Sequence, residues 1–431
     1  MRRPARRPDR LRDPPLRRGA SPGPARELHT GGTLTEVDTT SVLVIVSISA
    51  IAGLTAMLLP PRFAVPVVVI ELVLGIVIGP EVTDLAQNDP TTEFLGDLGL
   101  GMLFFFAGYE IDFQRIRGAP IKLGAIGWLL SLALAYGLGG ILAALGLVLS
   151  FLYTGSAMAT TAIGTLIPIL KDAGEMKTRF GTFLLAAGAM GEFGPILLIT
   201  LILSTTNPIH EAIVLIAFIV LAVTCGVLAV RSSWRGWPLL ERTIETSAQV
   251  AVRLAVVLVF GLVALATQLG LDLLLGGFVA GIIVRATLHG REISIFDSKV
   301  TAVGYGLLIP FFFVTSGMEF DIASLFASTE AMLKLPMFAA LFLVIRGLPA
   351  LLLYRKELGS RDRISLAIFS ATQLPLVVAI TTLAVDAGHM HSSTAAALVG
   401  AAIISALVYP LVGLRLRRDA SKEPAPAPAP A

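Results

Sequence analysis

Long apolar runs separated by short polar segments dominate the chain. A helix that crosses a bilayer needs about 20 mostly apolar residues, and the runs reach that length repeatedly. The pattern predicts about thirteen membrane-spanning helices. We place them at residues 41–60, 63–79, 94–112, 121–146, 148–170, 180–204, 211–230, 248–268, 271–288, 300–319, 331–354, 364–386 and 393–414.

The two ends of the chain differ from this apolar middle. Residues 1–40 are rich in Arg and Pro, and residues 417–431 end in an alternating Pro-Ala tail. Neither segment has enough apolar side chains to build a core, so both are predicted to be disordered. The sequence therefore predicts one transmembrane domain, residues 41–416, between two tails.

Composition agrees with a membrane protein. Apolar types make up 55% of the chain and charged types 15%, whereas soluble domains carry about 25% charge. The formal net charge of +3 gives no reason to expect a nucleic-acid partner. The single cysteine, Cys225, cannot form an internal disulfide. We therefore predict an all-α polytopic membrane protein.

Nucleotide-binding motifs are absent from the sequence. It contains neither a Walker motif nor the Gly-rich βαβ unit of dinucleotide-binding proteins. Transport driven by ATP is therefore not expected. The prediction is a transporter that is not an enzyme and needs no cofactor.

Basic residues orient the predicted helices. If the chain alternates across the membrane, nearly all Lys and Arg between the spans fall on the side of the C-terminus, and Lys334 falls on the other. Positively charged loops stay in the cytoplasm. We expect a multi-pass protein of the cell membrane with a cytoplasmic C-terminus.

Two pairs of segments repeat along the chain. Residues 104–112 (FFFAGYEID) and 311–321 (FFFVTSGMEFD) both join an aromatic run to a Gly-x-Glu-x-Asp pattern. Residues 160–174 and 372–388 both begin with Thr, pass a Pro and end in Asp-Ala-Gly. Each pair is separated by the same odd number of predicted spans, so the copies cross the membrane in opposite directions. Such inverted repeats, here roughly 63–204 and 271–414, are typical of secondary transporters.

The second pair of repeats also predicts broken helices. Thr160, Thr161 and Pro168 interrupt one predicted span, and Thr372-Gln373-Leu374-Pro375 interrupts its counterpart. Pro removes a backbone hydrogen bond, and small polar side chains can satisfy the groups that are freed. Two crossed, broken helices near the bilayer centre are therefore expected.

Three ionisable residues lie well inside predicted spans. Glu192 is near the middle of residues 180–204, and a carboxylate at that depth is a functional candidate. It can bind a proton or a hard monovalent cation but not both, which is sufficient for antiport. Arg346 is the natural counter-charge and keeps its own proton. For Glu71 a packing or hydrogen-bonding role is favoured, although it could serve as a second proton site.

These motifs resemble the Kef-like monovalent cation:proton antiporters of the Na⁺/H⁺ exchanger superfamily. Residues 71–80 (ELVLGIVIGP) are similar to the second-span motif of that family, residues 103–112 to the third and 310–318 to the tenth. The resemblance implies a homodimer in which each subunit has a scaffold domain and a moving core domain with crossed, unwound helices.

The resemblance also implies roles for single residues. Glu192 matches the ion-binding carboxylate, Thr160 and Thr161 match the unwound position, and Arg346 falls on the span where relatives carry Lys or Arg. There are two departures: Gly191 stands where relatives usually have Asn, Gln or Asp, and residues 372–374 (TQL) replace a frequent Gly-Glu-Phe.

We accordingly expect an exchanger of Na⁺ or K⁺ for H⁺ that alternates access to one carboxylate. The exchange is expected to be electroneutral, because Gly191 supplies no second carboxylate and Arg346 does not release a proton. Two alternatives remain open at this point: a gated K⁺ efflux pathway of the Kef type, and a membrane sensor without transport. An organic-anion symporter is disfavoured because Glu192 would repel its substrate.

Overall fold

The computed structural model describes residues 39–59, 65–111, 116–202, 208–233, 249–271, 273–288 and 291–420. Every regular element in these ranges is a helix, which confirms the all-α fold. Most of the predicted N-terminal tail, and residues 421–431 of the C-terminal one, lie outside the described residues.

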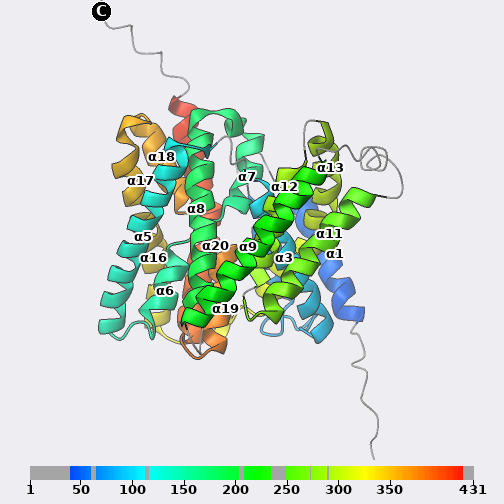
Figure 1. Cartoon of the computed structure of the whole chain (residues 1–431). Coiled ribbons are helices and arrows are strands. Elements are labelled where there is room, and N and C mark those ends of the chain that lie inside the picture. The colour runs from blue at the N-terminus through cyan, green and yellow to red at the C-terminus, as the bar shows by residue number, and fades with distance from the viewer. Residues whose placement is uncertain are drawn as a thin grey trace, which may run out of the picture. The chain divides into compact units, whose positions relative to one another are not determined.

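The helices follow one another with short connections (Figure 1). In chain order they are α1 (Thr39–Leu58), α2 (Val67–Ile78), α3 (Pro90–Tyr109), α5 (Ala119–Ala144), α6 (Phe151–Met158), α7 (Ile163–Asp172), η2 (Glu175–Lys177), α8 (Arg179–Ile202), α9 (Pro208–Ser233), α11 (Val250–Gln268), α12 (Leu273–Thr287), α13 (Arg291–Val303), η3 (Gly304–Leu308), α14 (Ile309–Met318), α15 (Ile322–Phe326), α16 (Thr329–Phe342), η4 (Leu343–Gly347), α17 (Leu348–Leu353), η5 (Tyr354–Lys356), α18 (Ser360–Ser370), α19 (Pro375–Asp386) and α20 (Ser392–Ala420).

Many of these helices suit a bilayer by length and composition. Within the described residues, eight helical segments are long and apolar enough to cross a membrane, and four shorter apolar helices accompany them. Each predicted span overlaps a described helix. The exact count of thirteen crossings stays a prediction.

Several helix boundaries differ from the sequence-based ones, and two of these differences add contacts or residues that the apolar pattern missed. The helix that leads into α14 begins at Arg291, nine residues before the predicted start at 300. Residues 291–299 are charged and amphipathic, so the apolar pattern did not reveal them. Helix α20 extends past residue 416 to Ala420, and Arg417 on it forms ion pairs with Glu175 at 2.8 Å and Asp362 at 2.5 Å. These contacts hold the end of the helix against η2 and α18.

The helices pack in two groups. Helices α2, α3, α11, α12 and α14 contact one another, and α1 and α9 lie against them. Helices α5, α6, α8, α16, α18 and α20 form the other group, which Figure 1 shows on the opposite side of the fold. The first group is called the scaffold group below, and the second, with α7 and α19, the core group.

Glycines bring the scaffold helices into close contact. A Cβ built on Gly75 of α2 would collide with the Val314 carbonyl of α14, and one on Gly317 would collide with the Leu72 carbonyl. Any larger side chain would force the helices apart. The glycines of the 71–80 motif therefore serve helix packing.

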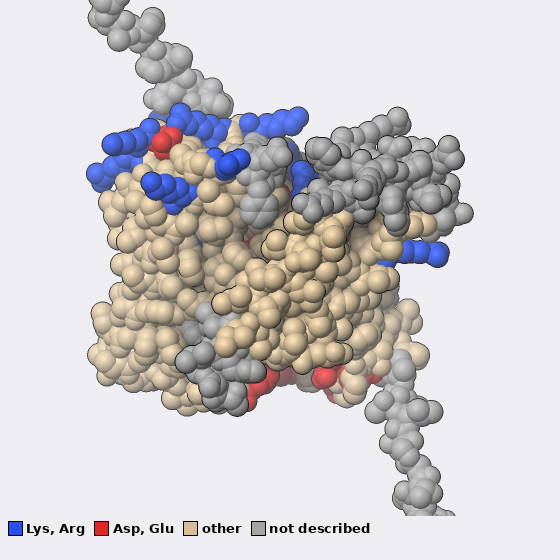
Figure 2. Space-filling view, in the orientation of Figure 1, with Lys and Arg blue, Asp and Glu red and all other residues tan. Residues whose placement is uncertain are grey.

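Charge divides the fold into two ends. Lys and Arg gather at the end where α17 and α20 finish, with a small acidic patch among them, and the other visible Asp and Glu lie at the opposite end (Figure 2). We call them the basic end and the acidic end. The basic end carries Lys171, Arg179, Arg355, Arg361 and Arg417, and the acidic end carries Glu93, Asp97, Glu319 and Asp386.

Candidate ion-exchange site

The core group contains two interrupted helices. Helix α6 ends at Met158 and α7 begins at Ile163, so residues 159–162 are not helical. Helix α18 ends at Ser370 and α19 begins at Pro375. Pro at the first position of a helix needs no hydrogen bond for its missing N–H, which favours a new start there. Pro168, by contrast, lies within the helical range of α7, so it is not what interrupts the first span.

The two interruptions cross and hold each other. The N–H of Ala162 donates to the carbonyl of Thr372 at 2.9 Å. Thr160 Oγ1 donates to Gln373 Oε1 at 3.0 Å, and Gln373 Nε2 donates to the Met158 carbonyl at 2.9 Å. Backbone groups that lost their helical partners thus find partners across the crossing, as buried polar groups must. The predicted crossing of broken helices is confirmed.

Thr161 connects the crossing to α8. Its side-chain Oγ1 donates to the Ser370 carbonyl at 2.6 Å, and its N–H donates to the Gly191 carbonyl at 3.0 Å. Thr161 is completely buried. The residue next to Glu192 is therefore fixed directly to the first interruption.

Glu192 is buried beside the start of α7, with 4% of its surface exposed. Its Oε1 accepts a hydrogen bond from the Gly164 N–H at 3.4 Å. The positive end of a helix dipole favours an anion at that place. Its Oε2 is buried and has no hydrogen-bonding partner in the described part of the chain. One carboxylate oxygen is thus anchored and the other is available to a ligand.

Arg346 lies on the π-helical turn η4 and is 4% exposed. Its guanidinium donates to Thr161 Oγ1 at 2.9 Å, to Ser131 Oγ and the Ala187 carbonyl at 3.2 Å, and to the Ser370 carbonyl at 3.4 Å. Ser370 ends α18, and the negative end of that helix dipole favours a cation. Arg346 was expected to be the counter-charge of a carboxylate. Among the described residues no carboxylate forms an ion pair with it, and its partners are carbonyl and hydroxyl oxygens.

The remaining predicted residues are distributed unevenly. Gln373 lies at the centre of the crossing, whereas Thr372 contributes its carbonyl and its buried hydroxyl has no partner among described residues. Glu71 is buried on α2, where that helix packs against α14 in the scaffold group. The structure therefore brings Glu192, Thr160, Thr161, Arg346 and the 372–373 backbone together and leaves Glu71 apart.

Two serines of the site escaped sequence analysis. Ser131 on α5 accepts from Arg346, and Ser405 on α20 exchanges hydrogen bonds of 3.0 Å with the N–H and the carbonyl of Gln373. Both are completely buried. A lone Ser in an apolar span is common, and its role depends on which helix lies opposite, so no local pattern distinguishes these two serines.

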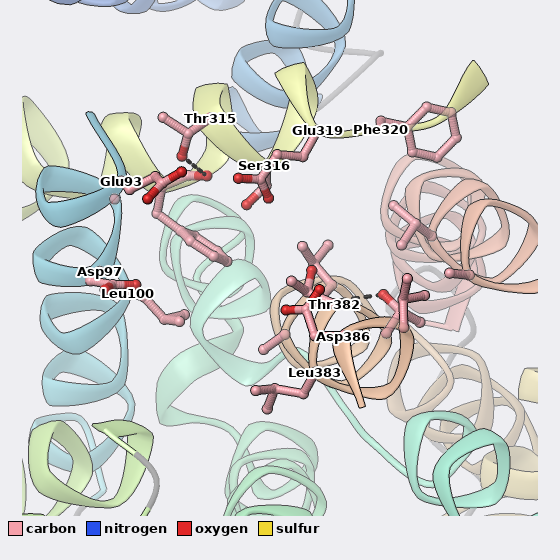
Figure 3. Close-up of a pocket in the computed structure, with 18 of the residues that line it drawn as sticks. Glu93, Asp97, Leu100, Thr315, Ser316, Glu319, Phe320, Thr382, Leu383 and Asp386 are labelled. Carbon is pink, nitrogen blue, oxygen red and sulfur yellow. Dashed lines mark hydrogen bonds between the residues drawn. The ribbon is translucent and has the colours of Figure 1, made fainter. Parts of the chain in front are cut away.

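A cleft opens on the acidic end between the two helix groups. It has a volume of about 640 Å³ and is lined by α3, α12, α14, α19 and α20. Figure 3 shows Glu93 and Asp97 of α3, Glu319 at the end of α14 and Asp386 at the end of α19 around this space. Its polar lining also includes Thr315, which bonds its own helix backbone. Carboxylates gathered around one cleft favour cations over anions there.

A smaller cavity lies between the crossing and the basic end. It has a volume of about 120 Å³. Its lining comes from both helix groups: α3 and α12 on one side, α7, η2 and α8 on the other. The two spaces differ greatly in size, about 640 Å³ at the acidic end and about 120 Å³ toward the basic end.

Known antiporters resemble most of this chain in sequence. The Bacillus subtilis protein YjbQ, which carries the name of a Na⁺/H⁺ antiporter, is 27% identical over 86% of this chain and 62% of its own length. The Na⁺/H⁺-K⁺ antiporter GerN of Bacillus cereus is 26% identical over 60% of this chain and 66% of its own length. This chain thus aligns with less than two thirds of either relative.

A solved structure and a family model also resemble this chain. The sodium proton antiporter MjNhaP1 from Methanocaldococcus jannaschii matches with a TM-score of 0.59 at 16% identity, over 88% of this chain and 96% of that one. At that identity the match shows a common fold. The model of the transmembrane sodium/hydrogen exchanger family matches residues 45–414, so the chain belongs to this family.

Proposed function

We propose that this protein exchanges a monovalent cation, Na⁺ or K⁺, for protons across the membrane, by alternating access to the carboxylate of Glu192. The observation that carries the proposal is the buried Oε2 of Glu192, which lacks a partner among described residues at the point where two broken helices cross. A buried, unpaired carboxylate oxygen is costly unless it binds a proton or a cation.

Further oxygen ligands are available for a dehydrated cation. A threonine hydroxyl has one proton and two acceptor lone pairs. Thr160 donates its proton within the crossing, and Thr161 donates to Ser370 and accepts from Arg346. Each therefore retains an acceptor position. We assign Glu192, Thr160 and Thr161 as the cation ligands, with Gln373 and the Thr372 backbone holding the crossing in shape.

We further propose a stoichiometry of one cation for one proton. Glu192 carries one positive charge in each direction, as a proton or as a cation. Gly191 adds no second carboxylate, and the guanidinium of Arg346 keeps its proton. Glu71 lies in the scaffold group, away from the crossing. No net charge then crosses the membrane in a cycle.

The ligand chemistry and the names of the relatives both point to Na⁺ or K⁺ as the cation. Carboxylate, hydroxyl and carbonyl oxygens suit Na⁺ and K⁺ alike. The name of GerN includes both Na⁺ and K⁺. A gated K⁺ efflux pathway or a sensor without transport is the less favoured function, because the relatives are named as antiporters.

We place the basic end in the cytoplasm of a cell in whose plasma membrane the protein lies. The supporting feature is the separation of charge in Figure 2, since Lys and Arg are retained on the cytoplasmic side. The acidic cleft then faces the outside. We also propose that two copies of the chain form a homodimer, in which the scaffold groups stay in place while the core groups move.

The proposal is tested with the purified protein in liposomes that contain a pH-sensitive dye. A proton gradient is imposed, and Na⁺, K⁺ or Li⁺ is added in turn to protein-containing and empty vesicles. Dissipation of the gradient that saturates with Na⁺ or K⁺ and needs the protein supports exchange. A gradient that persists with every cation would contradict it.

A further inference from the structure

A half-buried carboxylate, that of Glu110, lies between the crossing and the basic end. Glu110 follows α3, and its backbone N–H closes that helix by donating to the Phe106 carbonyl at 2.9 Å. Its side chain lines the 120 Å³ cavity. Its Oε2 is buried and makes no hydrogen bond to any described residue. Neither the crossing nor the helix packing accounts for this group.

The cavity leads from Glu110 to the helix faces that hold Glu192. It is lined by Ile163, the first residue of α7, and by Ala189, three residues before Glu192 on α8. Residues three apart lie on one face of a helix. On α3, Leu103 approaches Gly164, whose N–H binds Glu192, and Ala107 and Glu110 follow at helical spacing on the same face. Glu110 and Glu192 are close enough for their charges to interact.

Water fits the space between them. A cavity needs roughly 10–15 Å³ of water-accessible volume to hold one molecule, so 120 Å³ can hold several. Polar groups at the wall, Glu110 and Arg285, give such water hydrogen-bonding partners. Water in this cavity therefore reaches Glu110 and the faces of α7 and α8 that lie next to Glu192.

Within the described part of the chain, Glu110 forms no ion pair. The charged groups around it are Lys171 of α7, Arg285 of α12, Asp297 of α13 and Glu192 of α8, and the phenol of Tyr305 lies nearby. None of the salt bridges formed by described residues includes Glu110. The Arg285 guanidinium lies over the ring of Tyr109, 5.6 Å from its centroid.

The inverted repeat supplies a counterpart at the acidic end. Glu110 belongs to the Gly-x-Glu pattern after α3, and Glu319 holds the same place in the pattern after α14. Glu319 lines the large cleft, is exposed, and accepts from Asn88 Nδ2 at 2.8 Å. The two carboxylates thus flank the crossing from opposite ends. Glu319, at the acidic end, is exposed to solvent, whereas the Oε2 of Glu110, toward the basic end, is buried.

We propose that Glu110 is a proton relay of this transporter. When a cation displaces the proton of Glu192 at the basic end, the proton passes through cavity water to the Glu110 carboxylate and from there to the aqueous phase. The reverse path reloads Glu192. In each transfer one O–H bond breaks and one forms, so protons and charge balance. Because α3 belongs to the scaffold group, Glu110 stays at its own end and the stoichiometry remains one to one.

The test separates proton movement from cation movement, and it rests on the exchange proposed above. Glu110→Gln is compared with wild type in two liposome assays: proton release driven by Na⁺, and exchange of ²²Na⁺ for unlabelled Na⁺ at equal pH on both sides. The second reaction needs no net proton transfer. We expect Glu110→Gln to slow proton-coupled exchange at least tenfold, and to leave tracer exchange within twofold of wild type. Asp84→Asn, on an exposed acidic-end loop, should leave both rates unchanged.

Other results have distinct meanings. Equal losses in both assays would mean that Glu110 shapes the fold or binds the cation, and would overturn the relay. Unchanged rates in both assays would overturn it as well. A Glu110→Asp variant that recovers proton-coupled exchange supports the relay, because it restores the carboxylate. The wild-type protein is also tested for movement of ²²Na⁺, and of ⁸⁶Rb⁺ as a tracer for K⁺. If it moves these cations without moving protons, the proposed exchange function is wrong, and the relay is wrong with it.

Discussion

The guanidinium of Arg346 occupies the space that a side chain at position 191 would need. A Cβ built on Gly191 would lie 2.6 Å from Arg346 Nη2 and 2.7 Å from Thr161 Oγ1. Glycine at 191 and arginine at 346 are therefore a matched pair in this fold. The pairing accounts physically for the glycine beside Glu192, where the Kef-like pattern usually has Asn, Gln or Asp.

Gly191→Ala tests this pairing. The added methyl group has no room, so we expect the protein to lose about 1–3 kcal/mol of stability, as overpacked interiors do. Thermal unfolding of the purified protein in detergent gives the measurement. Gly140→Ala on α5 is the matched control, because a Cβ there meets nothing within 4 Å. It should be neutral or raise stability slightly, since Ala favours a helix. Equal melting temperatures for the two variants would contradict the contact.

The hydroxyl of Thr161 gives a second prediction. Thr161→Val removes one proposed cation ligand and the bonds to Ser370 and Arg346. The cation concentration for half-maximal exchange should rise about three- to thirtyfold, as expected for the loss of one hydrogen-bonded ligand among several. Thr165→Val on α7 is the control, because that buried hydroxyl has no partner among the residues described. A similar shift in both variants would argue against a ligand role.

Competition between proton and cation sets the pH dependence. If both bind Glu192, each lowers the apparent affinity of the other. The half-maximal cation concentration should therefore rise about tenfold for each pH unit lowered once the proton dominates the site. Initial rates of exchange at several pH values, each with a full cation titration, measure it. A half-maximal concentration that stays constant across pH would show that proton and cation use separate sites.

Electroneutral exchange is tested with a clamped membrane potential. Valinomycin and K⁺ set the potential across liposomes while Na⁺-driven proton movement is followed, and neither the rate nor the end point should respond to it. A dependence on potential, or a current on a solid-supported membrane, would refute one-for-one exchange. If Glu71→Gln then abolished that dependence, Glu71 would be the second proton site.

The orientation is tested by labelling cysteines from one side of the membrane. The native Cys225 is exposed and is first replaced by Ala. Arg355→Cys, at the basic end, should react with a membrane-impermeant maleimide from the cytoplasm, and Asp84→Cys should react from outside. External labelling of the Arg355→Cys protein would reverse the proposed orientation.

Much of the architecture was predictable because it depends on local patterns. Apolar runs located the spans, and the Thr-rich segments with Pro375 located both interruptions, although Pro168 was given a role it does not have. Glu192 was identifiable because an isolated carboxylate in an apolar run is costly. Contacts across helices were not predictable. Arg346 is surrounded by neutral oxygen atoms, including that of Ser131. Which oxygens reach it depends on how the neighbouring helices are rotated and aligned.

The most direct measurement of the central claim is cation-driven proton exchange by Glu192→Gln in dye-loaded liposomes. Gln fills nearly the same volume and can still accept from the Gly164 N–H, so the crossing should remain folded. It has no charge to exchange. The account predicts that the variant is monodisperse, melts near the wild-type temperature and dissipates no pH gradient when Na⁺ or K⁺ is added. Dissipation at the wild-type rate would show that Glu192 is not the carrier.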